Sequence, residues 1–375
     1  MAQTSSPNVV PGHPYSSPAE PPTLAALASD AVKAFGKRHR PRHRQRRAQE
    51  AADKTAAIVA RQRELDGILT DYLQHPATGI DMDSLKQPFP KDPEIDPRDA
   101  ESRPAPEWDH YAPPTLKGLG KLTSGGAYAK QRAQAARIFS MAVENYEATE
   151  AARKKRVRQV KQAQAELVSR TREQHLNIDR FVIALRNRER KAVSRYFQQV
   201  IDQLRDPDGL PTQRRAGYLP DTGLLALEWQ LPTLDIMPQE ESFSYDASRD
   251  FIETKHTSDG DRLRGYQRLI AQIALRAVHA VVGSDRYAVI DTVVFNGVVE
   301  SVDARTNRPI RPCLISLSTT PLQFTALELD KGDPARCARD QLRANVSPRP
   351  ERLYPVTPVL DFAEADPRKI HRPHR

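Results

Sequence analysis

The stretch FIETKH, from Phe251 to His256, places an acid and a lysine two residues apart, at Glu253 and Lys255. Nucleases of the PD-(D/E)xK class hold Mg²⁺ on an aspartate and on the acid of such a pair, because this ion prefers hard oxygen ligands, and the lysine helps to orient the attacking water. The aspartate would be Asp235 in LPTLDIMP, or alternatively Asp246. This pattern is compatible with Mg²⁺-dependent cleavage of a phosphodiester.

The surroundings of this pair favour a different interpretation. An acid-x-lysine triplet arises often by chance when 28% of the residues are charged. Glu253 lies in the polar stretch YDASRDFIETKHTSDGDR, which is typical of a loop, whereas a metal site needs a rigid frame. We therefore expect a solvated loop, no catalytic centre, no metal site and no cofactor, with Mg²⁺ relevant only to the nuclease alternative.

Two clusters of basic residues suggest contacts with nucleic acid. RKKRVRQVK (153–161) has six basic residues in nine, and KRHRPRHRQRR (37–47) has seven Lys or Arg in eleven, both without an acid. Each basic side chain that meets a phosphate releases condensed counterions, which favours binding. The alternatives are the solvated face of a long helix and a solvated charge block in a tail. The candidate phosphate contacts are Arg153, Lys154, Lys155, Arg156, Arg158, Arg38, Arg40, Arg42 and Arg44.

The net charge of +9 is concentrated in the middle of the chain. Residues 123–205 carry 18 Lys or Arg against 8 Asp or Glu, whereas residues 1–122 carry 17 against 16 and residues 206–375 carry 22 against 24. Electrostatic attraction to a polyanion is therefore expected from the middle segment rather than from the C-terminal part.

The N-terminal part is expected to be poorly packed. Residues 1–47 are rich in Pro, Ser and basic residues and are predicted to be a disordered basic tail. An apolar spacing of three and four residues predicts a helix over 48–75, one arm of a coiled coil. Residues 76–126 form a Pro-rich acidic linker, because eight prolines and nine acids lie between 80 and 114.

Residues 127–206 contain neither Gly nor Pro and are predicted to form one long basic helix. Its broken apolar seam includes Ile138, Met141 and Val157, and a seam of this kind buries itself against a partner helix. The partner is the helix over 48–75 folding back, a second copy of the chain, or both. A homo-oligomer through this helix is the expectation.

Residues 207–370 are predicted to form an α+β domain with antiparallel strand pairs. GYLPDTGLLALEWQL reads as a hairpin around the turn 220–223, and residues 262–283 read as a helix with one apolar face. Strands are expected over 287–302 and 311–319, followed by a short helix that begins after Asp333. The fold class is thus α+β, a helical stalk followed by a small mixed domain.

Some classes of protein are disfavoured by composition. No run of about 18 apolar residues occurs and the first 30 residues lack a signal-peptide pattern, so we expect a cytoplasmic protein without a membrane segment. Two cysteines, Cys313 and Cys337, provide neither a zinc ribbon nor a disulfide framework, and both are expected to be ordinary thiols.

Several long strings in the same order resemble a known family. RYFQQVIDQL, GYLPDTGLLALEWQLPTLDIMP, LRGYQRLIAQIALRAVHAVV, IDTVVFNGVVESVDARTNRPIRPCLISLSTT and YPVTPVLDFAEADPRKI are similar to the N-terminal region of actinobacterial Mrr-type restriction endonuclease proteins. The similarity extends over about residues 48–370. In that family the nuclease domain follows the place that corresponds to DPRKI, so the resemblance carries no catalytic residue onto this chain.

The resemblance and the basic clusters together suggest an accessory or truncated restriction-type protein, associated with DNA and with phage defence, without a nuclease centre of its own. One alternative is a coiled-coil module that binds another protein and no nucleic acid. The other is a cryptic Mg²⁺-dependent nuclease at Asp235, Glu253 and Lys255.

Overall fold

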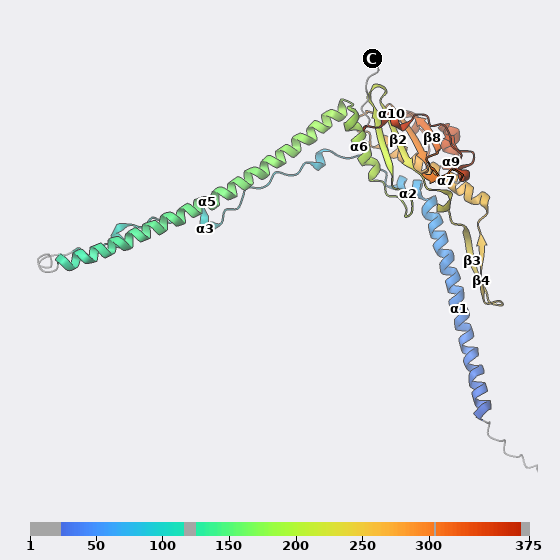
Figure 1. Ribbon diagram of the computed structural model, residues 1–375, viewed down its shortest axis with the longest axis horizontal. Coiled ribbons are helices and arrows are strands. Elements are labelled where there is room, and N and C mark those ends of the chain that lie inside the picture. Colours follow the sequence, from blue (N-terminus) through green and yellow to red (C-terminus); the bar gives the residue numbers. More distant parts are fainter. Residues whose placement is uncertain (1–23, 116–124, 304, 369–375) are drawn as a thin grey trace, which may run out of the picture.

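The computed structural model describes residues 24–115, 125–303 and 305–368. An α+β body carries two long helices that leave it in different directions, α1 (Leu24–Asp66) and α5 (Gly125–Arg186) (Figure 1). The predicted α+β class, with a long helix ahead of a small sheet domain, is confirmed. At about 1.5 Å per residue, α5 is ~90 Å long.

The body is built on a five-stranded sheet in the order β1-β2-β5-β8-β9. β1 and β2 form the predicted antiparallel hairpin. Gly223 closes its turn at a φ of 59°, and a Cβ at this position would overlap the Asp291 carboxylate, so the turn requires glycine. The strands are β1 (Arg214–Leu219), β2 (Leu224–Gln230), β5 (Thr292–Val298), β8 (Cys313–Thr319) and β9 (Asn345–Val346).

The central pair of strands, β2 and β5, is parallel, whereas the sequence had indicated only antiparallel pairs. A parallel pair needs a connection that returns to the starting end, and α7 (Asp259–Gly283) lies in that crossover. Ser258 begins α7 by accepting a hydrogen bond from the Asp261 amide. The mixed sheet therefore follows from the helix between its strands.

One face of the sheet packs on α6 (Arg190–Asp202) and α7. The largest side chains of the core, including Tyr218, Phe295 and Phe197, are completely buried in this layer. Burying each such side chain contributes about 1.5–3 kcal/mol. The opposite face of the sheet is covered by the C-terminal segment that contains α10 (Phe362–Ala365).

Short elements complete the described chain. The helices are α2 (Ile68–Gln74), α3 (Pro97–Ala100), α8 (Pro321–Thr325) and α9 (Pro334–Arg336), the last beginning at the predicted Asp333 cap, and the strands β6 (Ser301–Val302) and β7 (Pro309–Ile310) form a two-stranded ribbon. Single helical turns are Asp83–Leu85, Trp108–His110, Pro220–Thr222, Leu234–Ile236, Cys337–Gln341 and Pro350–Arg352.

The stretch around FIETKH is a hairpin, and the prediction of a loop there is wrong. β3 (Glu240–Asp246) and β4 (Phe251–His256) pair in antiparallel register. The hairpin lies against α1, where the Thr55 hydroxyl accepts from the Phe243 amide at 2.8 Å and contacts its carbonyl oxygen at 3.0 Å. The polar composition concealed this hairpin because it has little buried surface of its own and is held by the neighbouring helix.

The predicted boundary between a disordered tail over 1–47 and a helix over 48–75 is also wrong for the described residues. α1 runs without interruption from Leu24, and residues 1–23 lie outside the described part. Between Arg42 and Asp66 the chain has neither glycine nor proline and is rich in Ala, Arg and Gln, which favour helix. The helix ends before Gly67, and α2 follows.

The long helix predicted over 127–206 is broken in two. α5 ends at Arg186, and Arg188 adopts a left-handed φ of 56° before α6 begins. The Arg188 guanidinium is held at 2.6 Å from the Asp291 carboxylate and donates to the Ala288 carbonyl at 3.1 Å. A tertiary contact across about 100 residues thus stabilises a bend that local helix propensity does not predict.

The partner of α5 is an extended segment of its own chain. The helix over 48–75 was expected to fold back on α5, but α1 packs against β3 and α2 packs against α7. Residues 76–115, which we call the strap, instead run along α5 toward its far end (Figure 1). The prediction of a fold-back coiled coil is therefore wrong.

Candidate nucleic-acid interface

The strap is fastened to α5 by Asp99. Both Asp99 oxygens accept from the Arg156 guanidinium, at 2.6 and 2.8 Å, and the Asp99 carbonyl accepts from Arg153 at 2.8 Å. Arg153 also pairs with Glu150 on the preceding turn of α5. Two of the five predicted phosphate contacts are thus engaged within the chain.

These ion pairs set the ionisation of the acids. Hydrogen bonding from Arg156 holds the pKa of Asp99 below its usual range, and hydrogen bonding from Arg153 lowers the pKa of Glu150. Both carboxylates are therefore charged at neutral pH. The Asp99–Arg156 pair therefore stabilises the fastened strap at a pH above the ordinary pKa of aspartate, about 3.9. This stabilisation is lost as the pH falls through the lowered pKa of Asp99.

Other contacts fasten the strap on either side of Asp99. Near the far end of α5, the rings of Trp108 and Tyr111 meet Phe139 edge to face, with centroids 5.4 and 5.6 Å apart. Closer to the body, Gln174 donates to the Leu85 carbonyl at 3.0 Å and Lys86 lies 2.7 Å from Asp179. The strap thus covers one side of α5 over most of its length.

Replacing Asp99 with asparagine is expected to loosen the strap at this point, because Arg156 loses its charged partner. Tryptic cleavage after Arg98 should accelerate several-fold at neutral pH. Asp92→Asn is the matched control, since Asp92 is an exposed acid of the strap that makes no side-chain hydrogen bond or ion pair with any described residue. Equal cleavage rates in the two variants would contradict the conclusion that Asp99 fastens the strap to α5.

Further basic residues of this stretch of α5 take no part in fastening the strap, and they begin directly beside Arg153. We call Lys154, Lys155, Arg158 and Lys161 the basic face; all four are exposed. Among the described residues, none of the four has an ion pair shorter than 3.9 Å, the distance from Lys154 to Glu150. No acid occurs in the sequence between Glu150 and Glu166. A shallow hollow over Val157 and Ala165 adjoins three of these cations.

The second basic cluster lies on α1. Arg42 and Arg44 are exposed on this helix, whereas the side chains of Arg38 and Arg40 lie outside the described residues. Arg47, at the end of the cluster, pairs with Glu50 at 3.0 Å. The cluster therefore presents basic side chains along a helix rather than along a disordered tail.

The three residues of the nuclease alternative do not converge on a metal site. Glu253 and Asp246 share one face of the β3–β4 hairpin, but the Arg249 guanidinium lies between them, 3.4 and 3.3 Å away. Lys255 pairs with Glu241 at 2.6 Å, and Asp235 lies in a separate helical turn. No group of three potential ligands is found among the described residues. The Arg249 guanidinium thus already occupies the space between the Glu253 and Asp246 carboxylates, where a metal ion would have to bind.

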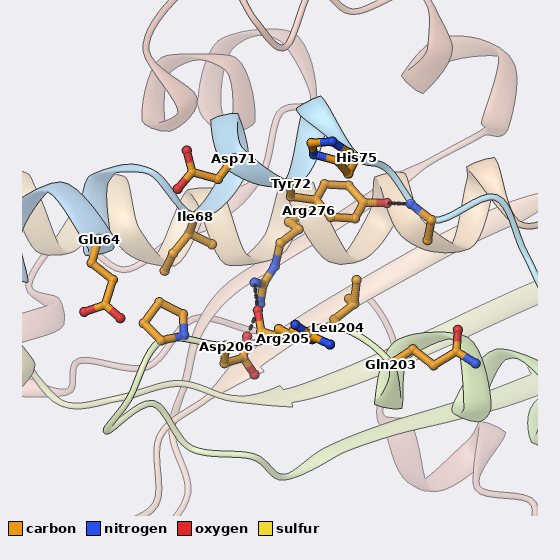
Figure 2. A pocket seen from close by; sticks show the side chains of 12 residues that line it. Glu64, Ile68, Asp71, Tyr72, His75, Gln203, Leu204, Arg205, Asp206 and Arg276 are labelled. Atoms are coloured by element: carbon orange, nitrogen blue, oxygen red, sulfur yellow. Dashed lines mark hydrogen bonds and ion pairs between the residues drawn. The ribbon is translucent and has the colours of Figure 1, made fainter.

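A buried ion pair that the sequence did not suggest joins α7 to the turn that follows α6 (Figure 2). Arg276 of α7 donates to the Asp206 carboxylate and, at 3.0 Å, to the Arg205 carbonyl. Asp206 also lies 3.3 Å from Arg214 on β1, so one carboxylate serves two guanidinium groups. The only signal in the sequence is an arginine within the apolar run IALRAVHAV.

A cavity of about 600 Å³ adjoins this pair, between α2 and the turn that follows α6. Its lining combines the acids Glu64 and Asp71 with Tyr72 and Arg276. The mixture of charges fits a junction between packed elements, and it indicates no particular ligand.

Elsewhere in the core, burial raises the pKa of the Cys313 thiol to about 11, so this group stays protonated at neutral pH.

No protein-family model, no curated protein and no solved structure matches the chain. Across the described ranges, no helix combines the length and apolar content that crossing a bilayer requires. The basic face of α5, set apart from the acidic strap, is the arrangement that most resembles a binding surface for a polyanion.

Proposed function

We propose that this protein binds duplex DNA through the basic face of α5. The observation that carries the proposal is the separation of charge around this helix. The Asp99 carboxylate of the strap pairs with Arg156, and Glu150 of α5 pairs with Arg153, whereas the basic face remains exposed without a close ion pair among the described residues. Successive cations on one helix face can meet successive phosphates, as a sequence-independent contact.

The basic cluster on α1 supports a second contact. α1 and α5 leave the same body in different directions, so their basic clusters offer two separate points of attachment (Figure 1). Two weak contacts on a stiff frame bind more tightly than either contact alone when one DNA molecule can reach both. The body then serves as the frame that fixes the two arms.

The resemblance to the front part of Mrr-type restriction proteins supports a setting in DNA restriction or phage defence. In this proposal the chain is an accessory component that holds DNA. The ion pairs of Glu253 and Lys255 argue against a catalytic role for the β3–β4 hairpin, because a nuclease would need its acids free for Mg²⁺.

A fluorescence-anisotropy titration with labelled duplex DNA tests the proposal. With Mg²⁺ present, we expect the affinity to fall at least about 100-fold between about 50 and 200 mM salt, the loss that the four cations of the basic face alone would produce. The DNA should remain intact on a gel afterwards. Absence of binding at both salt concentrations would favour the protein-interaction alternative, and cleavage would revive the nuclease alternative.

A further inference from the structure

A row of polar side chains crosses the main sheet on the face opposite α7. Pairing in register places Arg215, Glu228, Asn296, Ser316 and Asn345 side by side on five adjacent strands. The three central members are buried, with exposed fractions of 8% for Glu228, 3% for Asn296 and 0% for Ser316. Buried polar groups need partners: Glu228 pairs with arginines, whereas Asn296 and Ser316 have partners in the C-terminal segment, residues 354–368.

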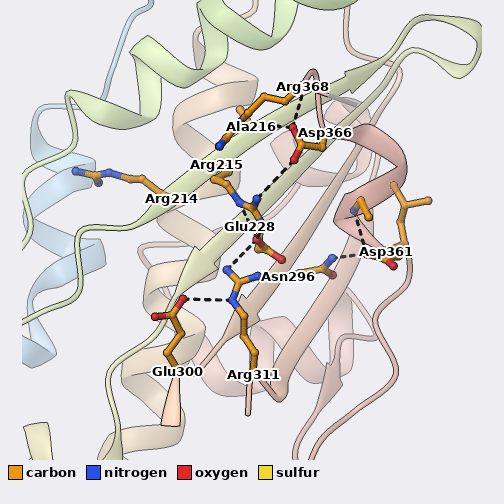
Figure 3. Close-up of polar contacts among 12 residues, drawn as sticks. Arg214, Arg215, Ala216, Glu228, Asn296, Glu300, Arg311, Asp361, Asp366 and Arg368 are labelled. Carbon is orange, nitrogen blue, oxygen red and sulfur yellow. Dashed lines mark hydrogen bonds and ion pairs between the residues drawn. The ribbon is translucent and has the colours of Figure 1, made fainter. Parts of the chain in front are cut away.

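The row binds the main chain of this segment, and Figure 3 shows its member Asn296 pointing toward it. Asn296 donates to the Leu360 carbonyl at 2.7 Å, and the Ser316 hydroxyl accepts from the Val359 amide at 2.9 Å. Asn345 donates to the Thr357 carbonyl at 3.3 Å. Contacts to main-chain groups hold an extended peptide in place whatever its side chains are, as in other modes of peptide recognition by sheets.

Specificity comes from the end of the segment that contains α10. Phe362 is 3% exposed and lies under the Arg215 guanidinium, 4.5 Å from ring centroid to Cζ. Ala365 is completely buried against Gly217, where any Cβ would overlap the Ala365 carbonyl. Asp366 lies 3.6 Å from Arg215. The face therefore selects an aromatic residue, a small residue three positions later and an acid next to it.

The side chain of Arg215 is itself held in position. Its guanidinium donates to Glu228 at 2.9 Å, and Arg311 donates to the same carboxylate oxygen at 2.9 Å. Arg311 is in turn 3.4 Å from Glu300 (Figure 3). This network fixes the Arg215 plane over the Phe362 ring before any peptide is bound, which lowers the cost of binding.

The segment buries few apolar side chains. Phe362 and Ala365 are its only buried apolar side chains, whereas Tyr354 is 59% and Val359 is 49% exposed. A tethered segment occupies its site at an effective concentration in the millimolar range, so a free copy at micromolar concentration competes poorly until the tethered one is weakened. Exchange of such a segment between identical chains creates no new type of contact.

We infer that this face of the sheet is a peptide-binding site that accepts residues 354–368 from a second copy of the chain as well as from its own. The inference is independent of the proposed DNA binding, because it uses none of the basic face.

The test uses a fluorescein-labelled synthetic peptide of residues 354–368 and the full chain. Phe362→Ala and, separately, Ala365→Glu weaken the tethered segment without altering the sheet. We expect saturable binding of the peptide to both variants, with an apparent affinity at least about tenfold higher than for the unaltered chain, because the tethered competitor is weakened. A peptide carrying Phe362→Ala should not bind measurably.

A second substitution tests the main-chain contacts. Adding Asn296→Ala to the Phe362→Ala chain should weaken peptide binding roughly fivefold, the usual value of one hydrogen bond. Absence of peptide binding by two variants that unfold as cooperatively as the unaltered chain would overturn the inference. Loss of cooperative unfolding in both would also overturn it, because the segment would then be an integral part of the fold.

Discussion

Replacing Asp206 with alanine is expected to lower the free energy of unfolding by about 3–5 kcal/mol, the usual cost of leaving buried charges without their partner. Asp206 is the shared counterion of Arg276 and Arg214, and the side chains of the three residues are 7%, 3% and 9% exposed. Burial already lowers the pKa of Arg214, and the Asp206 charge opposes that shift. The single substitution would therefore leave two buried guanidinium groups without the negative charge that stabilises them.

Asp202→Ala is the matched control for this prediction. Asp202 also faces Arg214, at 4.0 Å, but its side chain is 55% exposed, so its removal should cost less than about 1 kcal/mol. Urea unfolding of both variants, followed by circular dichroism, measures the difference. A loss of stability in Asp206→Ala no larger than that of the control would show that solvent reaches the pair in solution.

Replacing all four residues of the basic face with alanine is expected to weaken binding to duplex DNA by at least about 100-fold near 100 mM salt, since a phosphate without its cation keeps its condensed counterions. The loss should be uniform across DNA sequences, because the proposed contacts are to phosphates. Residual binding through α1 should remain. The measurement is the anisotropy titration at fixed salt.

The control for this variant removes the same number of charges elsewhere. Arg336, Arg339, Arg349 and Arg352 are exposed on the body and make no ion pair with any described residue. Replacing these four with alanine gives the same net charge and should change affinity by less than about threefold. Equal effects in the two variants would mean that overall charge, rather than the basic face, attracts DNA.

Local patterns predicted the elements that local residues determine. The β1–β2 hairpin follows from its turn at Gly223, and α7 follows from its apolar face. The bend at Arg188 and the β3–β4 hairpin were not predicted, because their contacts reach Asp291 and Thr55, which lie far away in the sequence.

The location of the basic excess was visible in the sequence, but its division between two faces was not. Arg153 and Arg156 find Asp99 more than 50 residues earlier, and only the course of the strap shows this. The apolar seam of α5 is likewise divided. The strap side holds Val157 half-buried, whereas Ile138 and Met141 remain 50% and 68% exposed, so the homo-oligomer through α5 stays a prediction.

The polar row of the main sheet was not predicted either. Its members come from five strands between Arg215 and Asn345, and none of them stands out in its own strand. Only the register of the strands brings them into one line. Recognising such a row from sequence would require knowledge of the parallel pairing of β2 with β5.

The most direct test of the central claim is the slope of log K against log salt concentration for duplex DNA. It should be measured for the unaltered chain, for the variant lacking the basic face and for the charge-matched control. If the basic face meets phosphates, its removal should flatten the slope by about 3 to 4, near 0.9 for each phosphate that is no longer neutralised, while the control keeps the original slope. A slope that is the same in all three proteins would contradict the assignment of α5 as the DNA-binding element.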